Sequence, residues 1–169
     1  MKYVNLALDS DALIKLAKSS AKEIVGSNYT LLLPPEVRRE CVEQGKAGGF
    51  PDAVRVEANI RSGRLSVRRP KRSGQTEALV KDLRLLGGEA DVLRLFRSGG
   101  VELVVSDDRR FVHLLEALGV PYATPSSLIA ALVRTKKLSG RDGLGYLDRL
   151  AGSISEEEYM EARRAIEEG

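Results

Sequence analysis

The sequence predicts an α/β fold with a central, mostly parallel, twisted β-sheet flanked by helices. Short apolar runs of strand length alternate with segments whose apolar residues recur at the helical period. Acidic residues follow directly after two of these runs, and 169 residues, 43% of them hydrophobic, are enough to enclose one core. Because helices connect successive strands, right-handed crossovers should make neighbouring strands parallel.

The first two strands of this pattern are each followed by a helix start signal. Residues 3–8 form an apolar run, and Asp9-Ser10-Asp11 then supplies N-cap chemistry for a helix. Residues 30–33 form the second run and lead into Pro34-Pro35, a pair that favours the first turn of a helix. We expect both acidic and proline segments to lie at the carboxyl ends of their strands.

The middle of the chain predicts three helices and one short strand. A helix over residues 51–61 is followed by residues 64–68, which alternate as in a strand. Residues 75–86 have helical periodicity, Gly87-Gly88 interrupts it, and a further helix covers residues 89–97. This region therefore places two helices in series before the next strand.

The next segment repeats the strand and helix alternation. Residues 101–105 form the clearest buried strand, and Ser106-Asp107-Asp108 leads from it into a helix over residues 109–118. Residues 119–123 read as a short final strand, and Pro125 opens another helix. Acidic residues again follow a core strand.

The tail from Ser139 to Gly169 predicts two more helices, the last one capped by Ser155. We divide the chain into a domain of residues 1–137 and a C-terminal helical extension, residues 138–169, packed on the same domain. The single Cys41 and the absence of a signal peptide favour a reducing, cytoplasmic compartment. No apolar run is long enough to span a bilayer, so we expect no membrane insertion.

Carboxylates should converge at one edge of the predicted sheet. Asp9 and the pair Asp107-Asp108 follow core strands, and ligands of parallel sheets bind at the carboxyl ends of the strands. Glu40 lies on a helix that begins at the same edge. Several carboxylates packed together repel one another unless a cation neutralises them, and oxygen ligands favour Mg²⁺ or Mn²⁺.

The helix after Gly87-Gly88 offers two further acids, Glu89 and Asp91. Their side chains point about 200° apart on a helix, so one helix does not readily aim both at one metal ion. Periodicity does not choose between them. Taken singly, each acid could instead cap a helix or stabilise its first turn. Together, acids that end two strands and open two helices favour a site.

The motifs resemble those of the PIN-domain family, as in VapC-type toxins and related prokaryotic proteins. The resemblance covers residues 3 to about 135 and implies a three-layer PIN-like fold with a longer helical tail. The motifs that carry it are Leu6-Ala7-Leu8-Asp9-Ser10-Asp11-Ala12-Leu13, Pro34-Pro35-Glu36-Val37-Arg38-Arg39-Glu40, Gly88-Glu89-Ala90-Asp91 and Ser106-Asp107-Asp108-Arg109-Arg110-Phe111.

This resemblance implies an endoribonuclease that uses Mg²⁺ or Mn²⁺ to activate water, acting as a toxin-antitoxin-type or RNA-processing enzyme. The family's four acidic catalytic positions match Asp9, Glu40, Asp91 and Asp108, and its small hydroxyl residue matches Ser106. Asp107 joins these four acids as a candidate metal ligand, whereas Ser10 and Glu89 are secondary candidates. The implied partners are RNA, an antitoxin-like protein and a second copy of the chain.

A basic segment near the middle of the chain is a candidate RNA contact, because guanidinium and ammonium groups pair with phosphates. Tyrosines at positions 29, 122 and 146 could stack on bases, but no stacking motif surrounds them. The only histidine, His113, makes neither a zinc site nor a triad. The basic residues are Arg61, Arg64, Arg68, Arg69, Lys71 and Arg72.

Two other functional hypotheses fit part of the sequence. Asp9-Ser10-Asp11 after a strand resembles the nucleophile motif of haloacid-dehalogenase-type phosphatases, in which the first Asp is phosphorylated and the second acts as acid and base. That reading gives Glu40 no role. The second alternative is a PIN-like module that binds RNA or protein without cutting.

Overall fold

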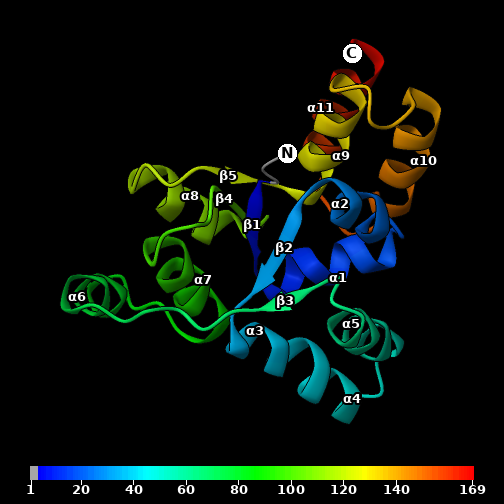
Figure 1. The fold of residues 1–169 in the computed structure, drawn as a ribbon. Coiled ribbons are helices and arrows are strands. Elements are labelled where there is room, and N and C mark those ends of the chain that lie inside the picture. Colours follow the sequence, from blue (N-terminus) through cyan, green and yellow to red (C-terminus); the bar gives the residue numbers. More distant parts are fainter. Residues whose placement is uncertain (1–3) are drawn as a thin grey trace.

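Five parallel strands form the central sheet of the computed structural model, which describes residues 4–169 (Figure 1). Their order is β3-β2-β1-β4-β5, with β1 between β2 and β4. The predicted α/β class and parallel pairing are confirmed; Tyr3, the expected start of the first strand, lies outside the described residues. The strands are β1 (Asn5–Leu8), β2 (Thr30–Leu33), β3 (Ser66–Val67), β4 (Leu103–Val105) and β5 (Tyr122–Ala123).

The helices follow the predicted alternation closely. One difference has a local cause: the helix predicted to run to residue 86 ends at Asp82, because Arg84 has a positive φ of 53°. The second difference is a helix at residues 22–28 that the sequence pattern does not predict. The helices are α1 (Ser10–Lys18), α2 (Lys22–Asn28), α3 (Pro35–Arg38), the π-helix η1 (Arg39–Gln44), α4 (Gly45–Ala47), α5 (Pro51–Arg61), α6 (Gly74–Asp82), α7 (Gly87–Arg97), α8 (Arg109–Ala117), α9 (Pro125–Arg134), α10 (Gly140–Leu150) and α11 (Glu156–Glu167).

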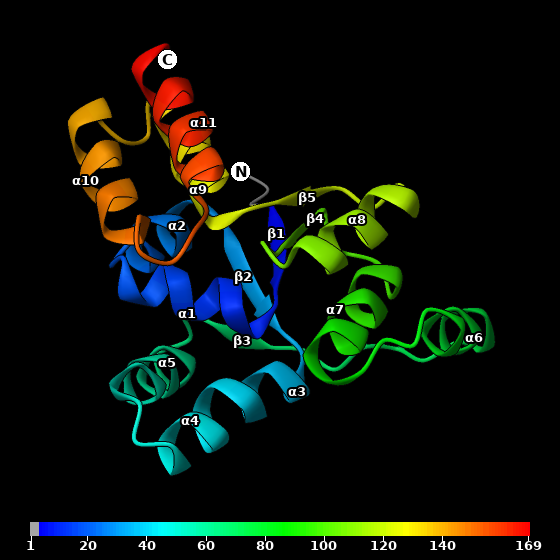
Figure 2. The ribbon, with the colours of Figure 1, turned by 180° about the vertical axis from the view of Figure 1, so that it is seen from behind.

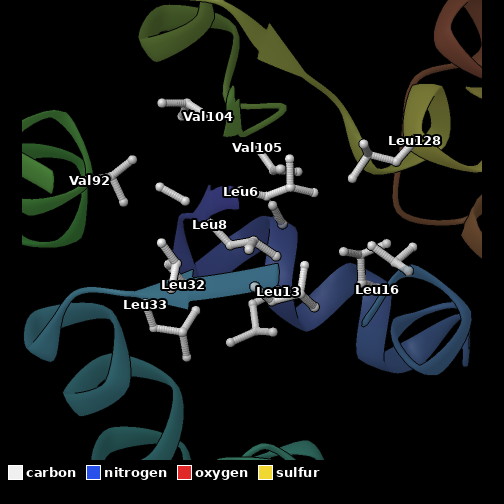
Figure 3. Packing of buried hydrophobic residues seen from close by; sticks show 14 of the residues in the cluster. Leu6, Leu8, Leu13, Leu16, Leu32, Leu33, Val92, Val104, Val105 and Leu128 are labelled. Carbon is white, nitrogen blue, oxygen red and sulfur yellow. The ribbon is translucent and has the colours of Figure 1, made fainter. Parts of the chain in front are cut away.

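Helices cover the sheet from both sides, which gives the three layers. In Figures 1 and 2, α7 lies on one side of the sheet and α1 lies on the other. Figure 3 shows Val92 of α7 approaching the strands from one side and Leu128 of α9 from the other, with Leu6 and Val105 between them. The sheet is buried on both faces, as parallel sheets generally are.

The C-terminal helices α10 and α11 pack on α9. Leu147 and Leu150 of α10 and Ile166 of α11 are buried in the same hydrophobic core as the strands. Gly143 allows the close approach, because a Cβ there would lie 2.5 Å from Cγ2 of Val133 on α9. Among residues 4–169, no helix combines the length and apolar character that crossing a membrane requires.

Candidate active site

Asp9 lies where β1 ends and α1 begins. Its backbone N–H donates to the carbonyl of Val105 at 3.2 Å, and its side chain caps α1 by accepting from the Ala12 N–H at 2.8 Å. Burial of this carboxyl, which is only 5% exposed, raises its pKa to about 7, although the Ser106 hydroxyl and the Ala12 N–H act in the opposite direction. The fold therefore keeps a carboxylate where its charge is costly.

Asp108 occupies the equivalent place after β4. It caps α8 by accepting from the Phe111 N–H at 2.8 Å, and its own N–H donates to the Ser106 hydroxyl at 3.3 Å. Because β1 and β4 pair in parallel, both capping carboxylates emerge at the same edge of the sheet. The placement of Asp9 beside Asp108 thus follows from strand pairing.

Glu40 reaches this edge from the π-helix η1, which follows β2 and α3. Single π turns inside helices often occur at functional sites, because the extra residue re-aims nearby side chains. The carboxylate of Glu40 accepts from the Gly88 N–H at 2.9 Å and from the Ser10 hydroxyl. Glu40 therefore links the amino-terminal ends of α1 and α7.

Helix α7 turns Glu89, rather than Asp91, toward this region. The Asp91 carboxylate pairs with Arg94 at 2.8 Å, and Arg94 also binds Glu77 of α6. Glu89 is held instead by Arg110 of α8 at 2.6 Å. Burial raises the pKa of Glu89, and the charges of Asp108 and Glu40 raise it further, while Arg110 lowers it. The expectation that Asp91 joins the pocket thus needs correction: the helix phase points Glu89 there.

Asp107 faces away from Asp108. Its Oδ2 accepts from the Lys15 ammonium at 2.5 Å, and the same ammonium pairs with Asp11 at 2.8 Å. The Asp107 side chain is 3% exposed, and its Oδ1 has no hydrogen-bond partner in the described part of the chain. Asp107, expected as a metal ligand, is therefore the buried partner of Lys15, a residue that the sequence motifs did not single out.

One pocket of about 340 Å³ collects the remaining acids. Its lining comes from the carboxyl ends of β1 and β4 and from the starts of α1 and α7, together with η1. Neither Asp91 nor Asp107 lines it. The lining residues are Asp9, Ser10, Asp11, Glu40, Leu86, Gly88, Glu89 and Asp108.

The carboxylate and hydroxyl oxygens around this pocket are the kind of ligands that a hard divalent cation prefers. Between residues 4 and 169, no three acidic, histidine or cysteine side chains converge closely enough to hold an ion by themselves. Mg²⁺, however, usually keeps several waters and takes only one or two protein carboxylates. Carboxylates around a pocket of this volume, one of them buried at a cost, fit a hydrated ion of this kind.

A second cleft of about 370 Å³ adjoins the acidic pocket and shares Asp11 and Glu40 with it. Phe50 lines this cleft with 65% of its surface exposed, and its ring packs closely against Gly48. On the acidic pocket itself, Leu86 is 82% exposed. Sequence reasoning missed both residues, since an apolar residue in a loop carries no periodic signal.

The expected nucleic-acid contacts are distributed away from the acidic pocket. None of the six basic residues from Arg61 to Arg72 lines it in the described chain, and Arg68 donates to the carbonyls of Gly99 and Gly100. The three candidate tyrosines are also elsewhere; Tyr122, for example, bonds Glu116. His113 is exposed on α8. Their proposed contacts with RNA stay predictions.

An acidic pocket at the carboxyl edge of a parallel sheet defines an α/β domain suited to divalent cations and anionic substrates. Residues 6–168 match the PIN-domain family DUF3368. The chain therefore belongs to the PIN-domain family, whose members are generally nuclease-like and typically metal-dependent. The match includes the last helices, α10 and α11. Neither a curated protein nor a solved structure matches this chain.

Proposed function

We propose that this chain is a ribonuclease that hydrolyses phosphodiester bonds of RNA with Mg²⁺ or Mn²⁺. The observation that carries the proposal is that Asp9, Glu40, Glu89 and Asp108, from four separate elements, line one pocket at the carboxyl edge of the sheet. Membership of a family of generally nuclease-like proteins supports the same activity.

One or two of these carboxylates would bind a hydrated ion directly and the others would contact its waters, with Asp9 and Asp108 fixed by helix capping. A bound divalent ion lowers the pKa of a coordinated water and offsets negative charge on the reacting phosphate. The Gly88 N–H and the Ser10 hydroxyl hold Glu40 in place. Arg110 pairs with Glu89 and is 61% exposed, so its guanidinium is also able to contact a substrate phosphate.

The adjoining cleft favours an unpaired strand as the substrate. An exposed aromatic ring such as Phe50 offers a stacking surface for a base, a contact worth about 1–3 kcal/mol. A base of a duplex has both faces covered by its neighbours and cannot use this surface. We therefore expect cleavage of single-stranded RNA, with weaker binding after Phe50→Ala.

The test is an assay of RNA cleavage by the purified protein. The protein should cut RNA with Mg²⁺ or Mn²⁺, and EDTA should stop the reaction because it removes the ion. Asp9→Asn and Glu40→Gln remove a charge at nearly constant shape, so turnover should fall by orders of magnitude while RNA binding largely remains. Glu43→Gln is the matched control, because Glu43 lies on the same π-helix and pairs with Arg38 outside the pocket. Equal activity in all three variants would contradict the proposal.

The two alternatives predict different results. A phosphatase would release phosphate from small monoesters, tolerate Glu40→Gln and fail after Asp11→Asn; Asp11 is 59% exposed and pairs with Lys15. A binding module would bind RNA tightly without cutting any RNA in a panel. An antitoxin-like partner and a homodimer remain predictions from the family resemblance.

A further inference from the structure

A small cavity lies on a part of the molecule that the proposed nuclease chemistry does not use. Its volume is about 160 Å³, and Leu31 of β2 and Leu65, just before β3, form its apolar wall. The cavity therefore lies beside the amino-terminal ends of these strands, whereas the acidic pocket lies at the carboxyl ends of β1 and β4. The remaining lining residues are Lys22, Glu23, Gly26, Ser27, Asn59 and Arg64.

Lys22 is buried here with only a loose ion-pair partner. The residue is 4% exposed, and the nearest carboxylate, on Glu23, is 3.8 Å from the ammonium. Across residues 4–169, Glu23 is the only carboxylate that pairs with this ammonium within 4.0 Å. Burial lowers the pKa of Lys22, and the nearby positive charges of Arg55 and Arg64 lower it further. An ammonium in this position is costly unless an anion joins it.

Arg64 provides a second cation whose backbone is held in position. The backbone carbonyl of Asn59 accepts from the N–H groups of Arg64 at 3.0 Å and Leu65 at 3.2 Å. The Asn59 side chain is itself anchored by donating to the Arg55 carbonyl at 2.7 Å. In the described part of the chain, no carboxylate pairs with Arg64 within 4.0 Å. Its guanidinium is therefore free to bind a ligand.

We propose that this cavity binds a phosphate group, held between the Lys22 ammonium and the Arg64 guanidinium. Phosphate oxygens match both a point charge and a guanidinium fork, and the volume accommodates one such group. Glu23 on the rim is 55% exposed, so its carboxylate can turn to solvent. The phosphate could be free, or it could be the terminal phosphate of a nucleotide or RNA strand. This binding is independent of the metal-dependent activity.

Melting temperature in phosphate and in chloride, at equal ionic strength and with EDTA present, tests the site without any contribution from a metal at the acidic pocket. We expect phosphate to raise the melting temperature of the wild type. Lys22→Met should abolish this increase and should itself raise the melting temperature in chloride, because it replaces a buried charge that is only loosely paired with an apolar chain. Arg64→Gln should weaken phosphate binding about tenfold.

Arg61→Gln is the matched control, because Arg61 is exposed in the same segment but does not line the cavity. A phosphate effect that is absent from the wild type, or that survives unchanged in both Lys22→Met and Arg64→Gln, would overturn the proposal. If a 5′-phosphorylated oligonucleotide also raises the melting temperature and its 5′-hydroxyl counterpart does not, the bound phosphate belongs to a strand end. If inorganic phosphate raises the melting temperature and neither oligonucleotide does, the ligand is a small molecule.

Discussion

The carboxylate of Glu40 accepts a hydrogen bond from the backbone N–H of Gly88 at 2.9 Å, which joins η1 to the start of α7. The contact requires that residue 88 have no side chain: a Cβ there would lie 2.7 Å from Glu40 Oε2 and 3.1 Å from Val37 Cγ2. The glycine that interrupts the helical pattern in the sequence is thus part of the site geometry.

Gly88→Ala should displace the Glu40 carboxylate and lower RNA cleavage, while the fold is kept. Alanine is otherwise better than glycine in a helix by about 1 kcal/mol, so a loss of activity would come from the contact with Glu40. Gly140→Ala is the control, since its Cβ would meet no atom within 4 Å at the start of α10. Unchanged cleavage by Gly88→Ala would mean that the position of Glu40 is not critical.

Glu89 and Asp91 should differ in metal binding. We expect Glu89→Gln to reduce the rise in melting temperature that Mn²⁺ produces, because Glu89 lines the pocket. Asp91→Asn should leave that rise intact and cost about 1 kcal/mol of stability through the partly exposed Arg94 pair. The opposite result in a Mn²⁺ titration would assign the ligand to Asp91, as the resemblance to the PIN-domain motifs implies.

The buried ion pair of Lys15 and Asp107 should contribute more to the free energy of unfolding than the exposed pair of Lys15 and Asp11. Lys15→Met leaves the Asp107 charge buried and unpaired, so urea unfolding should show a loss of about 3–5 kcal/mol. Replacing both residues, as Lys15→Met with Asp107→Leu, should recover most of this loss. Asp11→Asn removes the solvent-exposed partner and should cost less than about 1 kcal/mol. Equal costs for the two single variants would contradict the difference in burial.

The buried carboxyl of Asp9 should make the metal-free protein less stable as pH rises. Its pKa is about 7 in the folded chain against 3.8 for the free group, so the folded state binds the proton more tightly. The stabilisation is fully present below pH 3.8 and is lost as pH rises through about 7. The loss is on the order of 4 kcal/mol.

Urea unfolding at pH 5 and pH 8 in EDTA measures this effect. Asp9→Asn keeps an oxygen to cap α1 and should flatten the decline between the two pH values. Mn²⁺ at pH 8 should restore stability to the wild type more than to the variant. A decline that is identical in both proteins would place the titrating group elsewhere, for example at Glu89 or Asp107, whose pKa values are also raised.

The sequence by itself determined the α/β class and the parallel strands. It also determined the convergence of Asp9 and Asp108, because each of these two acids follows a buried apolar run and the two runs pair as parallel strands. Those features depend on local periodicity and on the handedness of crossovers.

The tertiary structure alone decided between Glu89 and Asp91, and separated Asp107 from Asp108. The phase of α7 depends on the burial of Ala90, Leu93 and Leu95 in the core, and the orientation of Asp107 depends on Lys15, 92 residues away in the chain. Lys22 also looks like an ordinary surface lysine until the fold brings Leu31 and Leu65 beside it, because burial arises from contacts between distant segments.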